Sequence, residues 1–160
     1  MRNIALVGLL GFLLLPGCRT NMTRYEAGNA DSAHKVLIAG EATAFKQAVV
    51  DGVIEKLGTR DWYFRVVGLD QLEAQETETF DAILLVAGYR AGRLDEGVIR
   101  YLAKDPTNPR VVLFFTRGSE DPMPEKYKPD VRVDAVSSAS REDRVESRAQ
   151  QLADLLRRRF

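Results

Sequence analysis

Two stretches of the chain are apolar without a polar break. Six apolar residues run from Ala82 to Ala87, preceded by Asp81 and followed by Gly88. A second run lies within residues 110–116. A strand with one face in water alternates apolar and polar residues, and these runs do not alternate. They predict strands buried on both faces, which occur in parallel sheets covered by helices.

Periodic patterns between and around these runs predict further strands and helices. From Phe45 to Leu57, apolar residues recur at i, i+3, i+4, i+7, i+8 and i+12, which places them on one face of a helix. Gly58 follows as a stop signal. The other predicted elements are strands at residues 35–40, 63–69 and 131–136, a surface helix or loop at 70–79, and helices at 94–104 and 145–156.

The repeated strand–helix order predicts one α/β domain over residues 35–160 with a five-stranded parallel sheet. Right-handed crossovers place helices on both faces of such a sheet. The strand at 63–69 is expected in an outer position, and the one at 131–136 at an edge. Parallel sheets bind ligands in the loops beyond the carboxyl ends of their strands. The loop from Gly88 to Arg93 is therefore the first place to expect a site.

The first eighteen residues have the pattern of a bacterial secretory leader. Arg2 precedes the apolar segment Ile4–Leu15, whose twelve residues would span about 18 Å as a helix, short of the hydrocarbon core of about 30 Å. Leu15-Pro16-Gly17-Cys18 then resembles a lipobox. The resemblance implies a signal peptide of residues 1–17 and lipid attachment at Cys18. The alternatives are an ordinary signal peptide, or an uncleaved anchor with an incidental cysteine.

Residues 18–34 are interpreted as a lipidated, flexible tether. They contain few large apolar side chains and no periodic pattern. The alternative is a tail that packs on the domain. Two or more acyl chains such as palmitate anchor a protein stably. We therefore expect a membrane protein of the cell envelope that faces the periplasm or exterior, with the lipid bilayer and an envelope protein or redox partner as its partners.

Composition excludes several classes of function. The 160 residues include 23 basic and 23 acidic side chains, so the charge gives no indication of nucleic-acid binding. One cysteine and one histidine exclude an internal disulfide and argue against a metal site. Dinucleotide-binding, P-loop and nucleophile-elbow motifs are absent, so no catalytic residue is predicted. Arg157–Arg159 are interpreted as complementing a helix dipole, with contact to anionic lipid as the alternative.

The domain resembles the flavodoxin-like family in three places. Residues 80–86 look like the family's third strand, Ala91–Leu94 look like the loop after it, and residues 111–118 look like the fourth strand and its loop. The resemblance implies a three-layer sandwich that binds flavin mononucleotide (FMN). The residues at the corresponding cofactor positions are Gly40, Thr43, Tyr89, Arg90, Gly92 and Gly118.

The phosphate loop of that family is rich in Ser, Thr and Gly, and residues 40–46 depart from it. Glu41 places a carboxylate near the phosphate position, although Lys46 is able to offset part of its charge. Like charges about 4 Å apart repel by about 1 kcal/mol in water and about 4 kcal/mol near a protein surface. This loop argues against tight flavin binding.

On the flavin-ring side of the predicted site, the residues depart less from the family pattern than those of the phosphate loop do. Tyr89 or Arg90 is able to stack on a planar ring. The alternative for Tyr89 is a loop residue that caps the end of the sheet. The sequence therefore favours a binding or accessory module without tightly bound flavin. The alternative is an FMN-binding electron-transfer protein or a flavodoxin-type oxidoreductase at the membrane.

Overall fold

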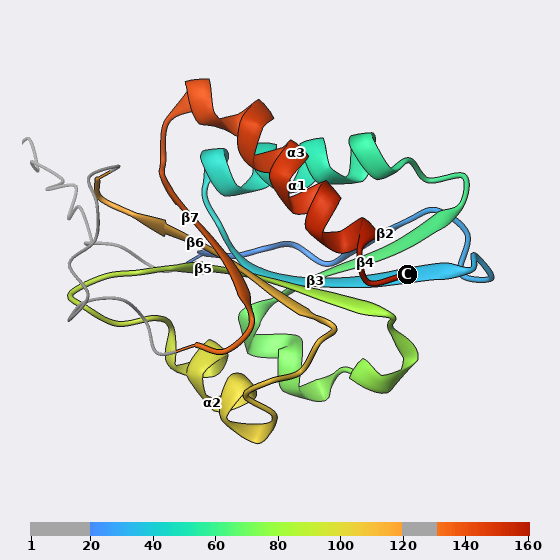
Figure 1. Ribbon diagram of the computed structural model, residues 1–160, viewed down its shortest axis with the longest axis horizontal. Helices are drawn as coiled ribbons and strands as arrows, with labels where there is room; N and C mark the ends of the chain where they lie inside the picture. The colour runs from blue at the N-terminus through green and yellow to red at the C-terminus, as the bar shows by residue number, and fades with distance from the viewer. Residues whose placement is uncertain (1–19, 120–130) are drawn as a thin grey trace, which may run out of the picture.

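Five parallel strands form the centre of the structure (Figure 1). The computed structural model describes residues 20–119 and 131–160; the predicted leader and lipobox lie outside them. The strand order is β4-β3-β5-β6-β7, and the predicted five-stranded parallel arrangement is confirmed. The strands are β3 (His34–Ala42), β4 (Trp62–Gly68), β5 (Ala82–Gly88), β6 (Val111–Arg117) and β7 (Asp134–Ala139).

Helices cover both faces of this sheet (Figure 1). Helix α1 (Ala44–Leu57) and helix α3 (Val145–Arg157) pack together on one face. The opposite face carries the short 3-10 helices η1 (Leu69–Ala74) and η2 (Thr77–Thr79) together with α2 (Glu96–Lys104). A further 3-10 helix, η4 (Glu142–Arg144), leads directly into α3. The three layers confirm the predicted sandwich.

The uninterrupted apolar runs arise because each central strand supplies two cores. In β3, Val36 and Ile38 belong to the core under α1 and α3, whereas Leu37 and Ala39 belong to the core under η1 and α2. Every residue of β5 is buried. Both faces of these strands are therefore shielded from solvent, and the expected burial of β5 and β6 is confirmed.

The expectation of a flexible tether is wrong for residues 20–27. Strand β1 (Thr20–Asn21) pairs antiparallel with the end of β3, and β2 (Tyr25–Ala27) pairs antiparallel with β4. Between them, Met22 is only 3 % exposed. The segment packs because its few large side chains enter the core and its backbone completes the outer edge of β4. The sheet is therefore mostly parallel, with two short antiparallel additions.

Two elements begin two or three residues later than predicted. Strand β7 begins at Asp134 rather than 131, because its pairing with β6 starts at the Val112–Asp134 register. Val131 and Val133 precede the strand and are partly buried against the core. Helix α2 begins at Glu96, after the N-cap Asp95, rather than at 94. Within this helix, Ile99 is 47 % exposed.

The last helix, α3, matches both its predicted apolar stripe and its predicted start at residue 145. Its N-cap is Arg144, which makes no side-chain capping bond. Arg157 lies in the last turn, where it donates to Asp154 and to the backbone oxygen of Lys56. Among residues 20–119 and 131–160, no helix has the length and apolar content needed to cross a bilayer.

Candidate functional site

The carboxyl ends of β3 and β5 meet at the point where the strand order reverses. From β3 the chain passes through α1 to β4 on one side, whereas β5 pairs with β3 on the other side. Open α/β sheets bind ligands in the crevice outside such a point. The predicted loop Gly88–Arg93 leaves β5 here, next to the start of α1 (Figure 1).

A buried ion pair lies at the end of β3. Glu41 is 4 % exposed and Lys46 is 1 % exposed, and the Lys46 Nζ donates to Glu41 Oε2 at 2.7 Å. The Arg90 guanidinium approaches the same oxygen at 3.6 Å from the β5 side. Thr43, the N-cap of α1, accepts a hydrogen bond from the Lys46 backbone N–H at 3.2 Å. The first turn of α1 is thereby oriented so that Lys46 points back to Glu41.

Gly88 gives these charges room to converge over the end of β5. A Cβ at this position would lie 3.0 Å from Glu41 Oε2, 3.2 Å from Arg90 Nε and 3.5 Å from Lys46 Nζ. Any larger residue would therefore force the Glu41 carboxylate or the Arg90 side chain to move. The crevice at the strand reversal is therefore filled by the Glu41 carboxylate and the two cations that face it.

The loop between β5 and α2 is a tight, exposed turn. Arg90 and Arg93 exchange backbone hydrogen bonds of 2.9 Å in both directions. The two residues between them, Ala91 and Gly92, have φ values of 49° and 77°, as in a two-residue type I′ turn. Tyr89 is half-buried, with its ring 5.7 Å from that of Phe115. This geometry presents both arginine side chains to solvent while Tyr89 rests on the sheet.

The remaining predicted cofactor residues lie at the same edge in different settings. Gly40 is inside β3, which extends to Ala42, so the predicted loop from 40 to 46 is shorter than expected. A Cβ on Gly40 would come within 2.8 Å of the Val86 Cβ, so a glycine is needed there for packing. On Gly92 or Gly118, a Cβ would meet no atom of the described residues within 4 Å. Their role in cofactor binding stays a prediction.

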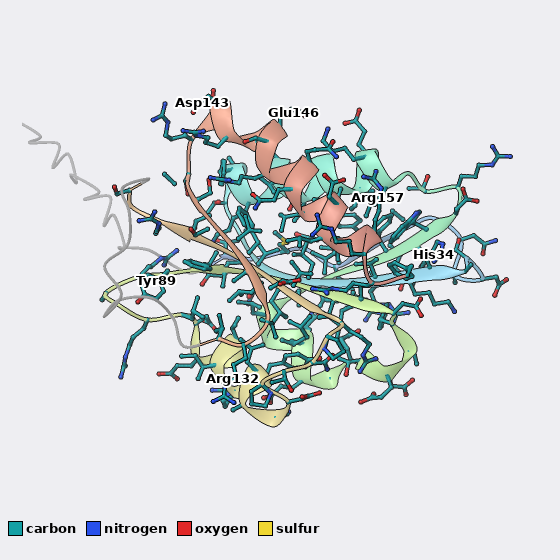
Figure 2. The ribbon with its side chains drawn as sticks, in the orientation of Figure 1. His34, Tyr89, Arg132, Asp143, Glu146 and Arg157 are labelled. Carbon is teal, nitrogen blue, oxygen red and sulfur yellow. The ribbon has the colours of Figure 1, made fainter. Side chains whose placement is uncertain are left out.

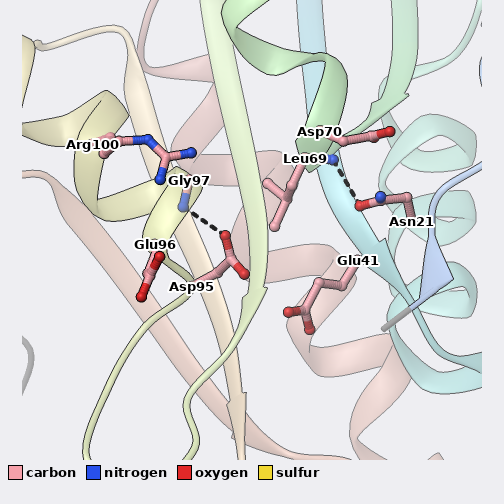
Figure 3. A pocket seen from close by; sticks show the side chains of 8 residues that line it. All are labelled: Asn21, Glu41, Leu69, Asp70, Asp95, Glu96, Gly97 and Arg100. Atoms are coloured by element: carbon pink, nitrogen blue, oxygen red, sulfur yellow. Dashed lines mark hydrogen bonds between the residues drawn. The ribbon is translucent and has the colours of Figure 1, made fainter. Parts of the chain in front are cut away.

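A cavity of about 270 Å³ adjoins the ion pair on the η1 and α2 side of the edge (Figure 3). Asn21 Oδ1 accepts from the Leu69 N–H at 3.2 Å, and Asp95 Oδ1 accepts from the Gly97 N–H at 2.7 Å. Its volume is slightly below the range of about 300–1,000 Å³ that is common for ligand pockets. The lining residues are Asn21, Glu41, Leu69, Asp70, Asp95, Glu96, Gly97 and Arg100.

The chemistry of this cavity does not suit a phosphate. Its lining carries four carboxylates and one guanidinium, that of Arg100, and the guanidinium is 3.6 Å from the Glu73 carboxylate. Within the described part of the chain, no group of three or more His, Cys, Asp or Glu side chains is arranged to hold a metal ion. The cavity favours a ligand with hydrogen-bond donors or positive charge over an anion.

Sequence reasoning missed this cavity, and of its lining it singled out only Glu41. Asn21 was assigned to the tether, and Asp70 to a surface loop. The one local signal is Asp95, which stands before an apolar helical pattern as an N-cap does. Because the lining comes from four separate segments, only the folded chain brings it together.

Solved structures resemble this fold, whereas no family model and no curated protein matches the chain. A flavodoxin from the domain Archaea superposes with a TM-score of 0.53 and 11 % identity, over 78 % of this chain and 98 % of its own. Flavodoxin 2 from Bacillus cereus gives 0.55 and 14 %, over 79 % and 99 %. A flavo-diiron protein variant from Thermotoga maritima gives 0.51 and 12 %, over 81 % of this chain and 37 % of its own. At these identities, the likeness shows a flavodoxin-like α/β fold.

Proposed function

We propose that this flavodoxin-like chain is a lipid-anchored envelope protein whose domain acts as a binding or accessory module without tightly bound flavin. The observation that supports a module without tightly bound flavin is the buried ion pair of Glu41 and Lys46 at the start of α1. The sequence Leu15–Cys18 supports the anchor. Each half of the proposal has its own test.

The Glu41 carboxylate opposes a phosphate at the start of α1. A helix N-terminus with hydroxyl and backbone donors normally favours an anion. Here Lys46 and Arg90 already face the Glu41 carboxylate at 2.7 and 3.6 Å. An entering phosphate would meet this buried negative charge, and repulsion between like charges grows as water is excluded. The chain thus supplies its own anion where a flavodoxin-like domain would bind the phosphate of FMN.

The alternative is an FMN-binding electron-transfer protein or a flavodoxin-type oxidoreductase at the membrane. Two observations favour it: the fold shared with flavodoxins, and the half-buried Tyr89 beside Phe115 at the carboxyl edge. A tyrosine face at this position is able to stack on a planar ring.

Thermal unfolding with added flavin separates the two functions. A ligand at about 100 times its dissociation constant stabilises a protein by about 2.7 kcal/mol. We expect FMN at high micromolar concentration to leave the melting temperature unchanged, because Glu41 disfavours the phosphate. Riboflavin, which has the same ring without the phosphate, is the matched control. A shift with riboflavin alone would indicate ring stacking without a phosphate site, whereas a clear shift with FMN would establish the alternative function.

The anchor is tested by Cys18→Ser, which removes the only thiol of the chain. We expect this variant to lose incorporation of labelled fatty acid and cleavage after Gly17, because no other residue is able to replace the thiol. The domain itself should keep the circular dichroism spectrum and melting temperature of the wild type, since Cys18 precedes the first strand. Equal fatty-acid label on both proteins would refute lipid attachment at Cys18.

A further inference from the structure

The described chain begins at the carboxyl edge of the sheet, beside the candidate site. Thr20 pairs with Ala42 and Asn21 with Glu41, the last two residues of β3. The Met22 backbone N–H donates to the Gly40 oxygen at 2.9 Å, and its side chain is buried. Asn21 also accepts a hydrogen bond from the Leu69 N–H. The start of β1 is therefore fixed against the same edge that carries the loops after β5 and β6.

This position places the predicted lipid close to the site. Cys18 precedes Thr20 by two residues, which reach at most about 7 Å when fully extended. We propose that the carboxyl edge of the sheet is held against the headgroup surface of the bilayer. This inference rests on the lipid anchor of the proposed function. The loop after β5, which leaves the sheet at this edge, then faces the bilayer surface.

The β5–α2 loop is suited to contact phospholipid headgroups. Arg90 and Arg93 are exposed on its tight turn, and the Arg90 side chain is 55 % exposed. A guanidinium binds phosphate oxygens in a bidentate manner. Tyr89, between these arginines and the sheet, has the mixed apolar and polar character of side chains at membrane interfaces. The acidic residues Asp70 and Asp95 line the neighbouring cavity, so the loop rather than the whole edge carries the positive charge.

The opposite end of the domain is expected to face away from the bilayer. Figure 2 shows His34 and Tyr89 at opposite ends of the molecule. The rings of His34, Trp62 and Phe160 pack within 5 Å of one another at the amino end of the parallel strands. The exposed turn at Thr59 and Arg60 lies at this end, immediately before β4. Arg60 is therefore a matched reference position for Arg93.

The test uses the lipidated, full-length mature protein in vesicles of zwitterionic and anionic phospholipid. A fluorophore is attached to Arg93→Cys or, as the control, to Arg60→Cys, because the native Cys18 sulfur is blocked by lipid. A quencher carried on lipid headgroups then reports how near each label lies to the bilayer. We expect quenching several-fold stronger at 93 than at 60. Equal quenching, or stronger quenching at 60, would overturn the proposed orientation.

A longer tether tests the cause of this orientation. A flexible Gly/Ser insertion of about 20 residues between Arg19 and Thr20 has a root-mean-square length of about 25 Å. We expect it to reduce the difference between the two labels, because the domain is then free to rotate. A difference that survives the insertion unchanged would overturn the short tether as its cause.

A mass spectrum of the same preparation distinguishes failure of the lipid anchor from failure of the proposed orientation. A mature chain without acyl groups would overturn the lipid anchor and this inference together. An acylated chain whose two labels are quenched equally would overturn the orientation alone and leave the anchor in place.

Discussion

Lys46→Ala is expected to lower the free energy of unfolding by about 3–5 kcal/mol, because it leaves a buried carboxylate without its principal partner. Lys46 is 1 % exposed, and its Nζ lies 2.7 Å from the Glu41 carboxylate. Arg90, at 3.6 Å and more than half exposed, compensates only in part. The change is measured as the difference in free energy from chemical denaturation of the two purified proteins.

Lys56→Ala is the matched control for this prediction. Lys56 also pairs with a carboxylate, that of Glu146, but the Glu146 side chain is 83 % exposed. Surface pairs of this kind contribute about 0–1 kcal/mol. We also expect the double variant Lys46→Met with Glu41→Gln to recover much of the stability lost in Lys46→Ala. Equal costs for Lys46→Ala and Lys56→Ala would contradict the view that the buried pair is a structural element of the site.

Leu85→Ala is expected to destabilise the protein by about 2–5 kcal/mol through the cavity that it leaves. Leu85 is fully buried in the middle of β5, where it pairs with Ala39 of β3 and Leu113 of β6. Packed strands on both sides restrict the collapse that would fill the space. The measurement is again the free energy of unfolding from chemical denaturation.

Ile99→Ala provides the comparison for a side chain of similar size outside the core. Ile99 lies in α2 and is 47 % exposed, and alanine has the higher helix propensity. Its substitution should change stability by less than about 0.5 kcal/mol, as is usual for surface positions. If Leu85→Ala were no more harmful than Ile99→Ala, the central position of β5 would be wrong.

The central strands could be predicted because their signal is local. Residues 82–87 and 111–115 are apolar at every position, a pattern that follows directly from burial on both faces. Helix α1 could be predicted as well, because its apolar spacing indicates the buried face and Gly58 indicates the end of the helix. These elements, taken in order, suffice to predict the parallel sheet and the edge at which a ligand would bind.

The antiparallel additions could not be predicted from pattern. Strands β1 and β2 contain two and three residues, too few to show a period. What holds them is tertiary: Met22 is buried under Gly40, and the Tyr25 hydroxyl donates to Asp51. Composition alone therefore favoured a flexible tether, although the structure shows the packed alternative.

The charges of the candidate site were recognised in the sequence, but their pairing was not. Lys46 was expected to offset only part of the Glu41 charge in an open loop, because β3 was expected to end at Gly40. The structure extends β3 through Ala42, which buries Glu41 and brings Lys46 over it. Because β3 ends two residues later than expected, Glu41 and Lys46 form a buried ion pair instead of lying in an open loop.

The absorbance spectrum of the protein purified from membranes tests the central claim most directly. The claim is that a flavodoxin-like domain with Glu41 and Lys46 paired at the start of α1 works without tightly bound flavin. The account predicts the spectrum of a protein alone, without visible absorbance from a flavin. A yellow preparation that carries one flavin per chain after extensive washing would contradict it.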